Sequence, residues 1–278
     1  MGKWYSIITV VLVFVLSGGA VRAAQNMEQE VRELLNKHPE ILIEALSKEK
    51  DSLLGLLEEA ARGRQQAEEA RRLEEERKNP LKPVLEPGRL ALGKADAPVP
   101  VVEYSDFFCH YCAAGAGVMK ELLARHPDDV RVVFKHFATD PLSRKAALYF
   151  EALGMQKPDM AWAFQDRVFA DQEKTAAGGE AALRELALSL GANAKRLDAD
   201  LARPELDERV KKDTEEARGF KFRGTPTFVV GGMSIRGAAP VEVFEDAVRR
   251  AKEAGKASGG KNAAPEAKKE CTDCREIK

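Results

Sequence analysis

The chain lacks an excess of basic residues, because 44 Lys and Arg are balanced by 45 Asp and Glu and the formal net charge is −1. Binding to a phosphate backbone depends on clustered positive charge, so this balance argues against a nucleic-acid-binding protein. The first apolar run, residues 7–16, is about half the roughly 20 residues that a membrane-spanning helix needs. The 44% of hydrophobic residues is nevertheless enough for a globular core.

The short apolar run follows Lys3 and precedes the small-residue stretch SGGAVRAA. This order is typical of a signal peptide. We expect residues 1–23 to be a signal peptide that is cleaved after Ala23, and the protein to be periplasmic. Disulfides persist in such an oxidising compartment. An uncleaved membrane anchor is the alternative.

Residues 24–79 show a helical pattern, because apolar residues recur every three to four positions. Pro39 suits the first turn of a second helix in this segment, and after residue 62 charges of both signs replace most of the apolar residues. Helices this narrow do not bury their leucines alone. They would pack on the main domain, bind a partner, or form a homo-oligomer through residues 26–79.

Three further segments follow. The proline-rich residues 80–88 predict a linker. Residues 89–254 alternate between strand and helix patterns, with an all-helical insertion at about 142–218 and a hairpin near Gly231-Gly232. Residues 255–278 are rich in Gly, Ala and Lys, which predicts a flexible tail.

Cysteine is scarce, with four residues in the chain. Cys109 and Cys112 lie where an apolar strand pattern, VPVVEYSDF, meets a helix pattern, CAAGAGVMKELLARHP. Unpaired N–H groups at a helix N-terminus stabilise a thiolate, so this placement favours a redox dithiol in which Cys109 is reactive and Cys112 resolves. A structural zinc site needs four ligands, and neither zinc nor an inert disulfide explains the strand-to-helix junction.

The stretches LGKADAPVPVVEYSDFFCHYC, VRVVFKHF and GTPTFVVGG resemble the DsbA family of periplasmic thiol–disulfide oxidoreductases over residues 88–252. The resemblance implies an α/β thioredoxin fold with an inserted helical domain. It also implies unfolded or misfolded exported proteins as substrates, and a membrane redox partner that reoxidises or reduces the dithiol. No organic cofactor is expected, because the dithiol carries both electrons. Oxidation and isomerisation both remain open.

The N-terminal stretch VRELLNKHPEILIEALSK is similar to the segment that precedes the catalytic domain in ScsC-like members of the family. In that group the segment drives oligomerisation. The resemblance therefore implies several catalytic domains around a shared cleft, which would suit isomerisation of misfolded substrates.

The family resemblance assigns roles to further residues. Thr225-Pro226 corresponds to the cis-proline loop that faces the CxxC and lines the substrate groove. Glu103, six residues before Cys109, corresponds to a buried acid that would move the proton of Cys112. Lys135 would be the partner of Glu103; the alternative is that both side chains lie on solvated strand faces.

His110 and Tyr111 stand between the two cysteines. A cationic His110 would favour the Cys109 thiolate and make the disulfide more oxidising; the alternative is that His110 is a neutral, exposed side chain. The commonest oxidase of the family has proline and then histidine at these positions, whereas here histidine comes first and proline is absent. This departure leaves the redox potential open.

A second CxxC, Cys271 and Cys274, lies in the tail and departs from the family pattern. It would form an inert surface disulfide, relay electrons to the first pair, or hold Cu(I) or zinc. The alternative function is therefore a copper-handling or chaperone module that uses its cysteines to bind. No metal ligands are assigned, because two thiolates are too few for a closed site.

Overall fold

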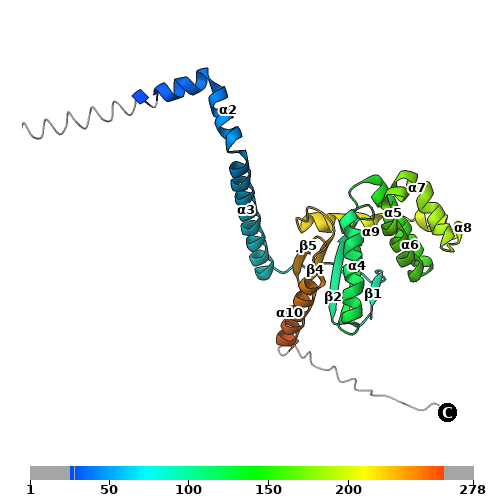
Figure 1. Cartoon of the computed structure of the whole chain (residues 1–278). Helices are drawn as coiled ribbons and strands as arrows, with labels where there is room; N and C mark the ends of the chain where they lie inside the picture. The colour runs from blue at the N-terminus through cyan, green and yellow to red at the C-terminus, as the bar shows by residue number, and fades with distance from the viewer. Residues whose placement is uncertain (1–25, 28, 260–278) are drawn as a thin grey trace, which may run out of the picture. The chain divides into compact units, whose positions relative to one another are not determined.

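The computed structural model describes residues 26–27 and 29–259 (Figure 1). The expected signal peptide and the second cysteine pair lie outside the described residues. The chain divides into two units, residues 1–70 and 71–278. In the described part, no helix is both long enough and apolar enough to cross a membrane.

The described part of the first unit is helical. Residues 29–37 are helical, α2 spans Pro39–Lys48 with Pro39 in its first turn as predicted, and α3 spans Lys50–Lys78 and continues into the second unit. None of the α2 side chains is buried. The large apolar side chains of this unit are exposed at Met27, Val31, Leu34, Ile41, Leu42, Ile43, Leu46, Leu53, Leu54, Leu56 and Leu57. Among the described residues of this unit, nothing covers its apolar face.

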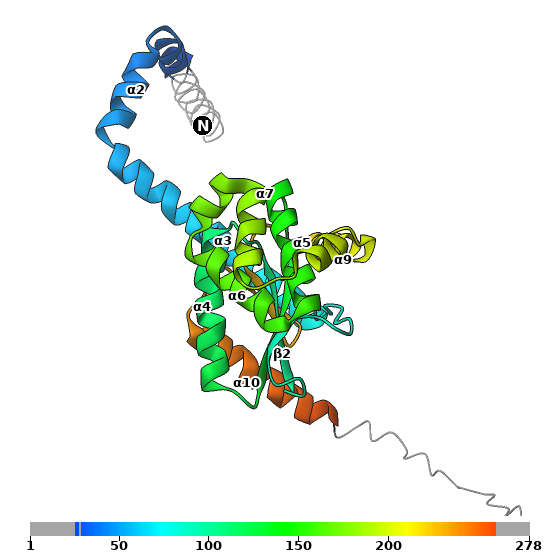
Figure 2. The same cartoon turned by 90° about the vertical axis from the view of Figure 1, so that its right-hand side faces the viewer.

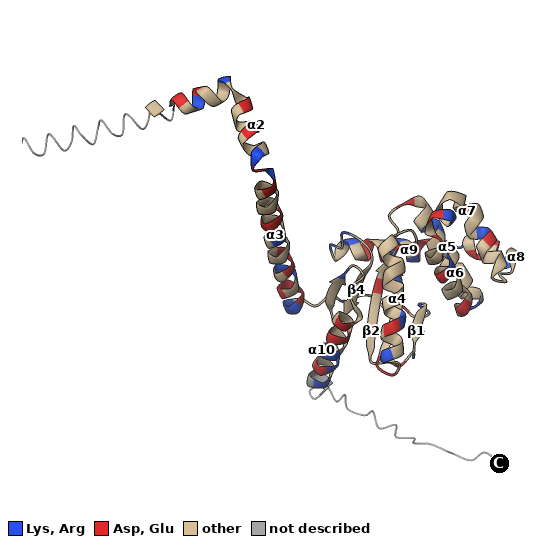
Figure 3. Ribbon diagram, in the orientation of Figure 1, with Lys and Arg blue, Asp and Glu red and all other residues tan. Residues whose placement is uncertain are grey.

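Charged residues of both signs occur along α3, as Figure 3 shows. Several of them pair one helical turn apart, for example Arg62 with Glu58 and Lys78 with Glu74. Such exposed pairs contribute little each, but they support a solvated helix. The charges of both signs that the sequence shows after residue 62 are typical of such a helix.

The second unit is built on a five-stranded sheet in the order β1-β3-β2-β4-β5. The central strands β2 and β3 are parallel, and the other neighbouring strands are antiparallel. The strands are β1 (Ala91–Gly93), β2 (Val99–Ser105), β3 (Val130–His136), β4 (Thr227–Val230) and β5 (Met233–Arg236). The sequence did not predict β1, because three residues are too few to show an alternating pattern.

The hairpin between β4 and β5 turns at the predicted glycines. Gly231 and Gly232 have φ of 58° and 83°, a region in which a side chain is strained and which a two-residue hairpin turn requires. A Cβ on Gly232 would also lie 2.5 Å from the Cβ of Pro80. The glycine thus lets the linker approach the turn, where Leu81 donates its N–H to the carbonyl of Gly232.

Helices pack on both faces of the sheet: α4 (His110–Arg125) and α10 (Val241–Gly259) lie on one face, and the end of α9 (Pro204–Gly219) packs on the other through Ala217. α4 and α10 pack together against residues such as Val101 and Phe228 (Figure 2). Between β3 and β4 lies the helical insertion, with its own apolar core. Its helices are α5 (Pro141–Gln156), α6 (Pro158–Ala170), α7 (Gln172–Ser189), α8 (Ala194–Leu201) and α9 (Pro204–Gly219). This is the thioredoxin fold with inserted helices that the sequence predicted.

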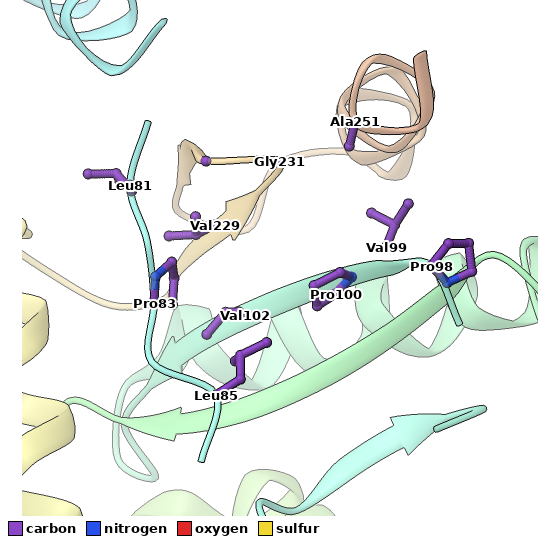
Figure 4. Close-up of a pocket in the computed structure, with 11 residues that line it drawn as sticks. Leu81, Pro83, Leu85, Pro98, Val99, Pro100, Val102, Val229, Gly231 and Ala251 are labelled. Carbon is purple, nitrogen blue, oxygen red and sulfur yellow. The ribbon is translucent and has the colours of Figure 1, made fainter. Parts of the chain in front are cut away.

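The linker crosses the opposite face of the sheet. Leu81, Pro83 and Leu85 lie over β2 and β4 and enclose an apolar pocket of about 280 Å³ with Val102 and Val229 (Figure 4). None of the site residues predicted from the sequence lines this pocket.

The C-terminal end of α3 covers the exposed edge of β5. Glu76 accepts hydrogen bonds from the backbone N–H of Ser234 at 2.7 Å and from its hydroxyl at 2.6 Å. Arg72 donates to the carbonyl oxygen of Ser234 at 3.1 Å. An edge strand presents unpaired backbone groups that favour association with other strands. Glu76 and Arg72 form hydrogen bonds with the backbone N–H and carbonyl of Ser234, so these groups are not open to another strand.

The loop between β2 and α4 is anchored by Phe107, which is 1% exposed. Its ring lies 5.6 Å from that of Phe150 and 5.9 Å from that of Phe164, both in the helical insertion. We expect Phe107→Ala to lower the free energy of unfolding by about 3–5 kcal/mol, because a large buried side chain leaves a cavity. Urea unfolding followed by circular dichroism measures this change.

Leu188→Ala is the matched control, because Leu188 lies in the same helical insertion but is 39% exposed. Substitution at exposed positions usually changes stability by about 0.5 kcal/mol or less. A loss of about 1 kcal/mol or less for Phe107→Ala would show that this ring does not anchor the loop.

Candidate functional site

Cys109 is the N-cap residue of α4, and its extended backbone joins the loop to the helix. Its side chain is half-buried, whereas Cys112, one turn later, is 0% exposed. The N–H of Cys112 donates to the carbonyl of Cys109 at 3.0 Å, which closes the first turn of the helix. The strand-to-helix junction is as the sequence predicted, and both cysteines are free thiols.

The pKa values of the two thiols are shifted in opposite directions. The pKa of Cys109 is lowered to about 5, first by a hydrogen bond from Cys112 and then by contacts with Thr225 and with the backbone of Cys112 and Tyr111. Burial raises the pKa of Cys112 above its usual value, and the hydrogen bond to Cys109 raises it further. Near neutral pH, Cys109 is therefore a thiolate, whereas Cys112 keeps its proton.

The peptide bond between Thr225 and Pro226 is cis, as the family resemblance implied. The Cys109 thiol donates to the Thr225 carbonyl oxygen at 3.2 Å, so this loop faces the redox pair. A Cβ on Gly115 of α4 would lie 3.1 Å from the Cγ of Pro226. The absence of a side chain at Gly115 thus allows the helix and the loop to pack closely.

Glu103 lies inside the protein, on the α4 side of β2, and is 2% exposed. Desolvation raises its pKa to about 7, and a contact with Ser105 partly opposes that rise. A carboxyl group with such a pKa exchanges protons near neutral pH. The alternative that Glu103 lies on a solvated strand face is wrong.

Lys135 does not contact Glu103, so their predicted pairing is corrected. Lys135 stands opposite Tyr104 in the β2–β3 register, and Tyr104 points to the other face of the sheet from Glu103. There Lys135 forms ion pairs with Asp213 at 3.3 Å and with Glu216. The Lys135 side chain is itself buried, so the alternative that it lies on a solvated strand face is wrong as well.

His110 and Tyr111 are exposed at the start of α4, and Tyr111 is 66% accessible. Their rings meet edge to face with centroids 5.9 Å apart. Both side chains are thus available to a molecule that approaches Cys109. Their effect on the redox potential stays a prediction.

Two residues that the sequence did not single out hold the active-site loop. Gln172 of α7 donates from Nε2 to the carbonyl oxygens of Phe107 and Cys109, both at 2.9 Å. Asp106 accepts from the N–H of Phe108 at 2.8 Å. Gln172 lies more than 60 residues from its partners, so no local pattern marks it.

Known proteins with a similar sequence or fold include thioredoxin-like proteins and disulfide-forming proteins. A family model described as thioredoxin matches residues 86–250. The chain is 31% identical over 152 residues to the probable disulfide bond formation protein D of Bacillus anthracis, which covers 51% of this chain and 69% of that protein. The crystal structure of oxidised BdbD from Bacillus subtilis has a TM-score of 0.53 and 26% identity, covering 60% of this chain and 94% of that one.

The chain also resembles part of a longer membrane protein. It is 38% identical over 146 residues to the Na(+)/H(+) antiporter NhaA of Herminiimonas arsenicoxydans, covering 52% of this chain but 23% of the antiporter. The chain thus spans about a quarter of that protein, and the antiport activity is not carried over. The matched region, residues 86–250, contains the CxxC helix and the cis-proline loop. The chain therefore belongs to the DsbA-like thioredoxin family of thiol–disulfide oxidoreductases, and its CxxC pair is Cys109 and Cys112.

Proposed function

We propose that the protein catalyses disulfide exchange in exported proteins that are folding or misfolded. The observation that carries this proposal is the difference between the two thiols, with the pKa of Cys109 lowered to about 5 and that of the buried Cys112 raised. The signal-peptide pattern in residues 1–23 supports the periplasm as the place of action.

In the reductive direction, the Cys109 thiolate attacks one sulfur of a substrate disulfide. A bond forms between Cys109 and that sulfur, and the other substrate sulfur leaves with the electron pair. Cys112 then loses its proton and attacks Cys109, which releases the second substrate thiolate and oxidises the pair. The reverse sequence delivers a disulfide to a substrate.

The loop at Thr225 and Pro226 is proposed to seat the substrate chain beside Cys109. Its position supports this role, because the Thr225 carbonyl oxygen lies 3.2 Å from Cys109 Sγ. An extended peptide that pairs with backbone groups here would bring its own sulfur to Cys109. Exposed His110 and Tyr111 would border the same peptide.

Glu103 is proposed to accept and return the proton of Cys112. Its burial on the α4 side of the sheet and its pKa of about 7 support this role. Lys135 has no part in this transfer, because it pairs with Asp213 and Glu216 on the other face.

A second copy of the chain is proposed to cover the exposed leucines of the first unit. These helices bury none of the α2 side chains, and apolar stripes of this size need a second surface. The similarity of this segment to ScsC-like proteins supports self-association. Several redox sites in one assembly would suit isomerisation, with a membrane partner that keeps Cys109 and Cys112 reduced.

The activity is tested with the mature chain, residues 24–278, and a scrambled-disulfide test protein. We expect the reduced form to reactivate it, Cys109→Ser to abolish reactivation, and Cys112→Ser to accumulate mixed disulfides, because it lacks the resolving thiol. Gel electrophoresis without reductant detects these adducts. Reactivation that persists in Cys109→Ser would contradict the proposed mechanism.

The direction of the reaction is decided by a second assay with the same preparation. Fast oxidation of a reduced test protein by the disulfide form, without reactivation of the scrambled one, would identify an oxidase. Isomerisation by the proposed assembly would then be excluded.

Self-association is tested by replacing Leu53 and Leu57 with serine. Because these exposed leucines would be buried between copies, we expect the double variant to have a lower mass in analytical ultracentrifugation than the native chain. Gln66→Ser on the same helix is the control and should keep the native mass. A monomeric native chain, or a variant with unchanged mass, would contradict self-association through these helices.

A further inference from the structure

Three buried polar side chains meet beneath the redox site. Glu103 is 2% exposed, Ser105 1% and Cys112 0%. Glu103 and Cys112 have proposed roles, whereas Ser105 has none so far. A serine hydroxyl buried to this extent normally has a hydrogen-bond partner.

Ser105 lies between the other two groups. It is two residues after Glu103 on β2, so both side chains point to the α4 face of the sheet. The N–H of Asp106, the next residue, lies 3.4 Å from Cys112 Sγ. The sulfur of Cys112 therefore stands at the end of β2, where Ser105 is.

Neither Ser105 Oγ nor Glu103 Oε1 has a hydrogen-bond partner within the described residues, so both polar atoms are buried beside the Cys112 end of β2 without one. The Ser105 side chain lowers the pKa of Glu103 and that of Cys112, against the rise that burial causes in each. A serine hydroxyl both donates and accepts. Its oxygen can accept a hydrogen bond from a thiol while its O–H donates one to a carboxylate.

Other ionisable groups around this cluster are directed elsewhere or belong to the redox pair. Cys109 bonds to Cys112 from the start of α4. The Asp106 carboxylate accepts from the Phe108 N–H and the Ser143 hydroxyl. Lys135 lies on the opposite face of the sheet. Of the carboxyl groups named here, Glu103 is thus the one that shares the α4 face of β2 with Ser105.

We propose that the Ser105 hydroxyl relays the proton between Cys112 and Glu103 during disulfide exchange. Ser105 is thus a positioning residue for the resolving step, and this inference rests on the proposed role of Glu103.

The relay balances in both directions. When a mixed disulfide joins Cys109 to a substrate, Cys112 gives its proton to Ser105 Oγ while the Ser105 proton passes to the Glu103 carboxylate. The Cys112 thiolate attacks Cys109, the bond between the two cysteines forms, and the substrate thiolate leaves with the electron pair of the broken bond. In the reverse reaction, Cys112 leaves as thiolate and recovers the proton by the same route.

The test separates attack from resolution, with glutathione disulfide as the probe. Rapid quenching and mass spectrometry count the glutathione adduct of Cys109 and the internal disulfide. We expect Ser105→Ala to leave the attack rate unchanged and to slow resolution about 100-fold, the lower end of what a positioned acid–base group contributes.

The pH dependence distinguishes a relay from a structural role. In the native protein, resolution should accelerate as pH rises through about 7, because the Glu103 carboxyl must lose its own proton before it accepts another. This midpoint should be absent in Ser105→Ala and in Glu103→Gln, and the double variant should be no slower than Glu103→Gln alone. Ser105→Thr keeps the hydroxyl and should restore both rate and midpoint.

Stability is measured for each variant by urea unfolding. Ser234→Ala removes another buried hydroxyl, on β5, and should leave both rates and the midpoint unchanged. If Ser105→Ala resolves the mixed disulfide at the native rate while Glu103→Gln resolves it slowly, the relay alone is overturned. If Glu103→Gln resolves it at the native rate, the role of Glu103 and the relay are overturned together.

Discussion

The difference in solvation between two thiols one helical turn apart governs the chemistry of this protein. Cys109 lies where α4 begins, and the backbone of Tyr111 and Cys112 there lowers the pKa of its thiol, whereas Cys112 lies wholly in the core. The hydrogen bond between them lowers the pKa of Cys109 and raises that of Cys112. In the proposed mechanism, one thiol is thereby ready to attack, and the other holds its proton until a mixed disulfide has formed.

The rest of the second unit keeps these two positions fixed. Phe107 ties the loop before the helix to the aromatic core of the insertion, and Gln172 holds two carbonyl groups of the same loop. The cis-proline loop lies against α4 at Gly115 and completes the site from the opposite side. The helical insertion thus helps to position Cys109 through the loop that it anchors.

Local sequence patterns predicted the parts of the site that local geometry determines. The apolar strand that runs into a CxxC predicted Cys109 at a helix start, whereas the facing Thr225-Pro226 loop was expected from the family resemblance. The pairing of Glu103 with Lys135 was wrong, because which face a strand residue occupies depends on the register between β2 and β3. Gln172 was missed because its contacts come from a distant helix. The leucines of the first unit were predicted to need a partner, but a single sequence does not identify that partner.

The central claim is the difference in reactivity between the two thiols. It is measured most directly by alkylating the reduced, folded protein with iodoacetamide from pH 4 to pH 10 and locating the label by mass spectrometry. The account predicts that Cys109 reacts with a rate midpoint at about pH 5 and that Cys112 stays unlabelled. A midpoint for Cys109 near that of an ordinary thiol, or equal labelling of both cysteines, would contradict it.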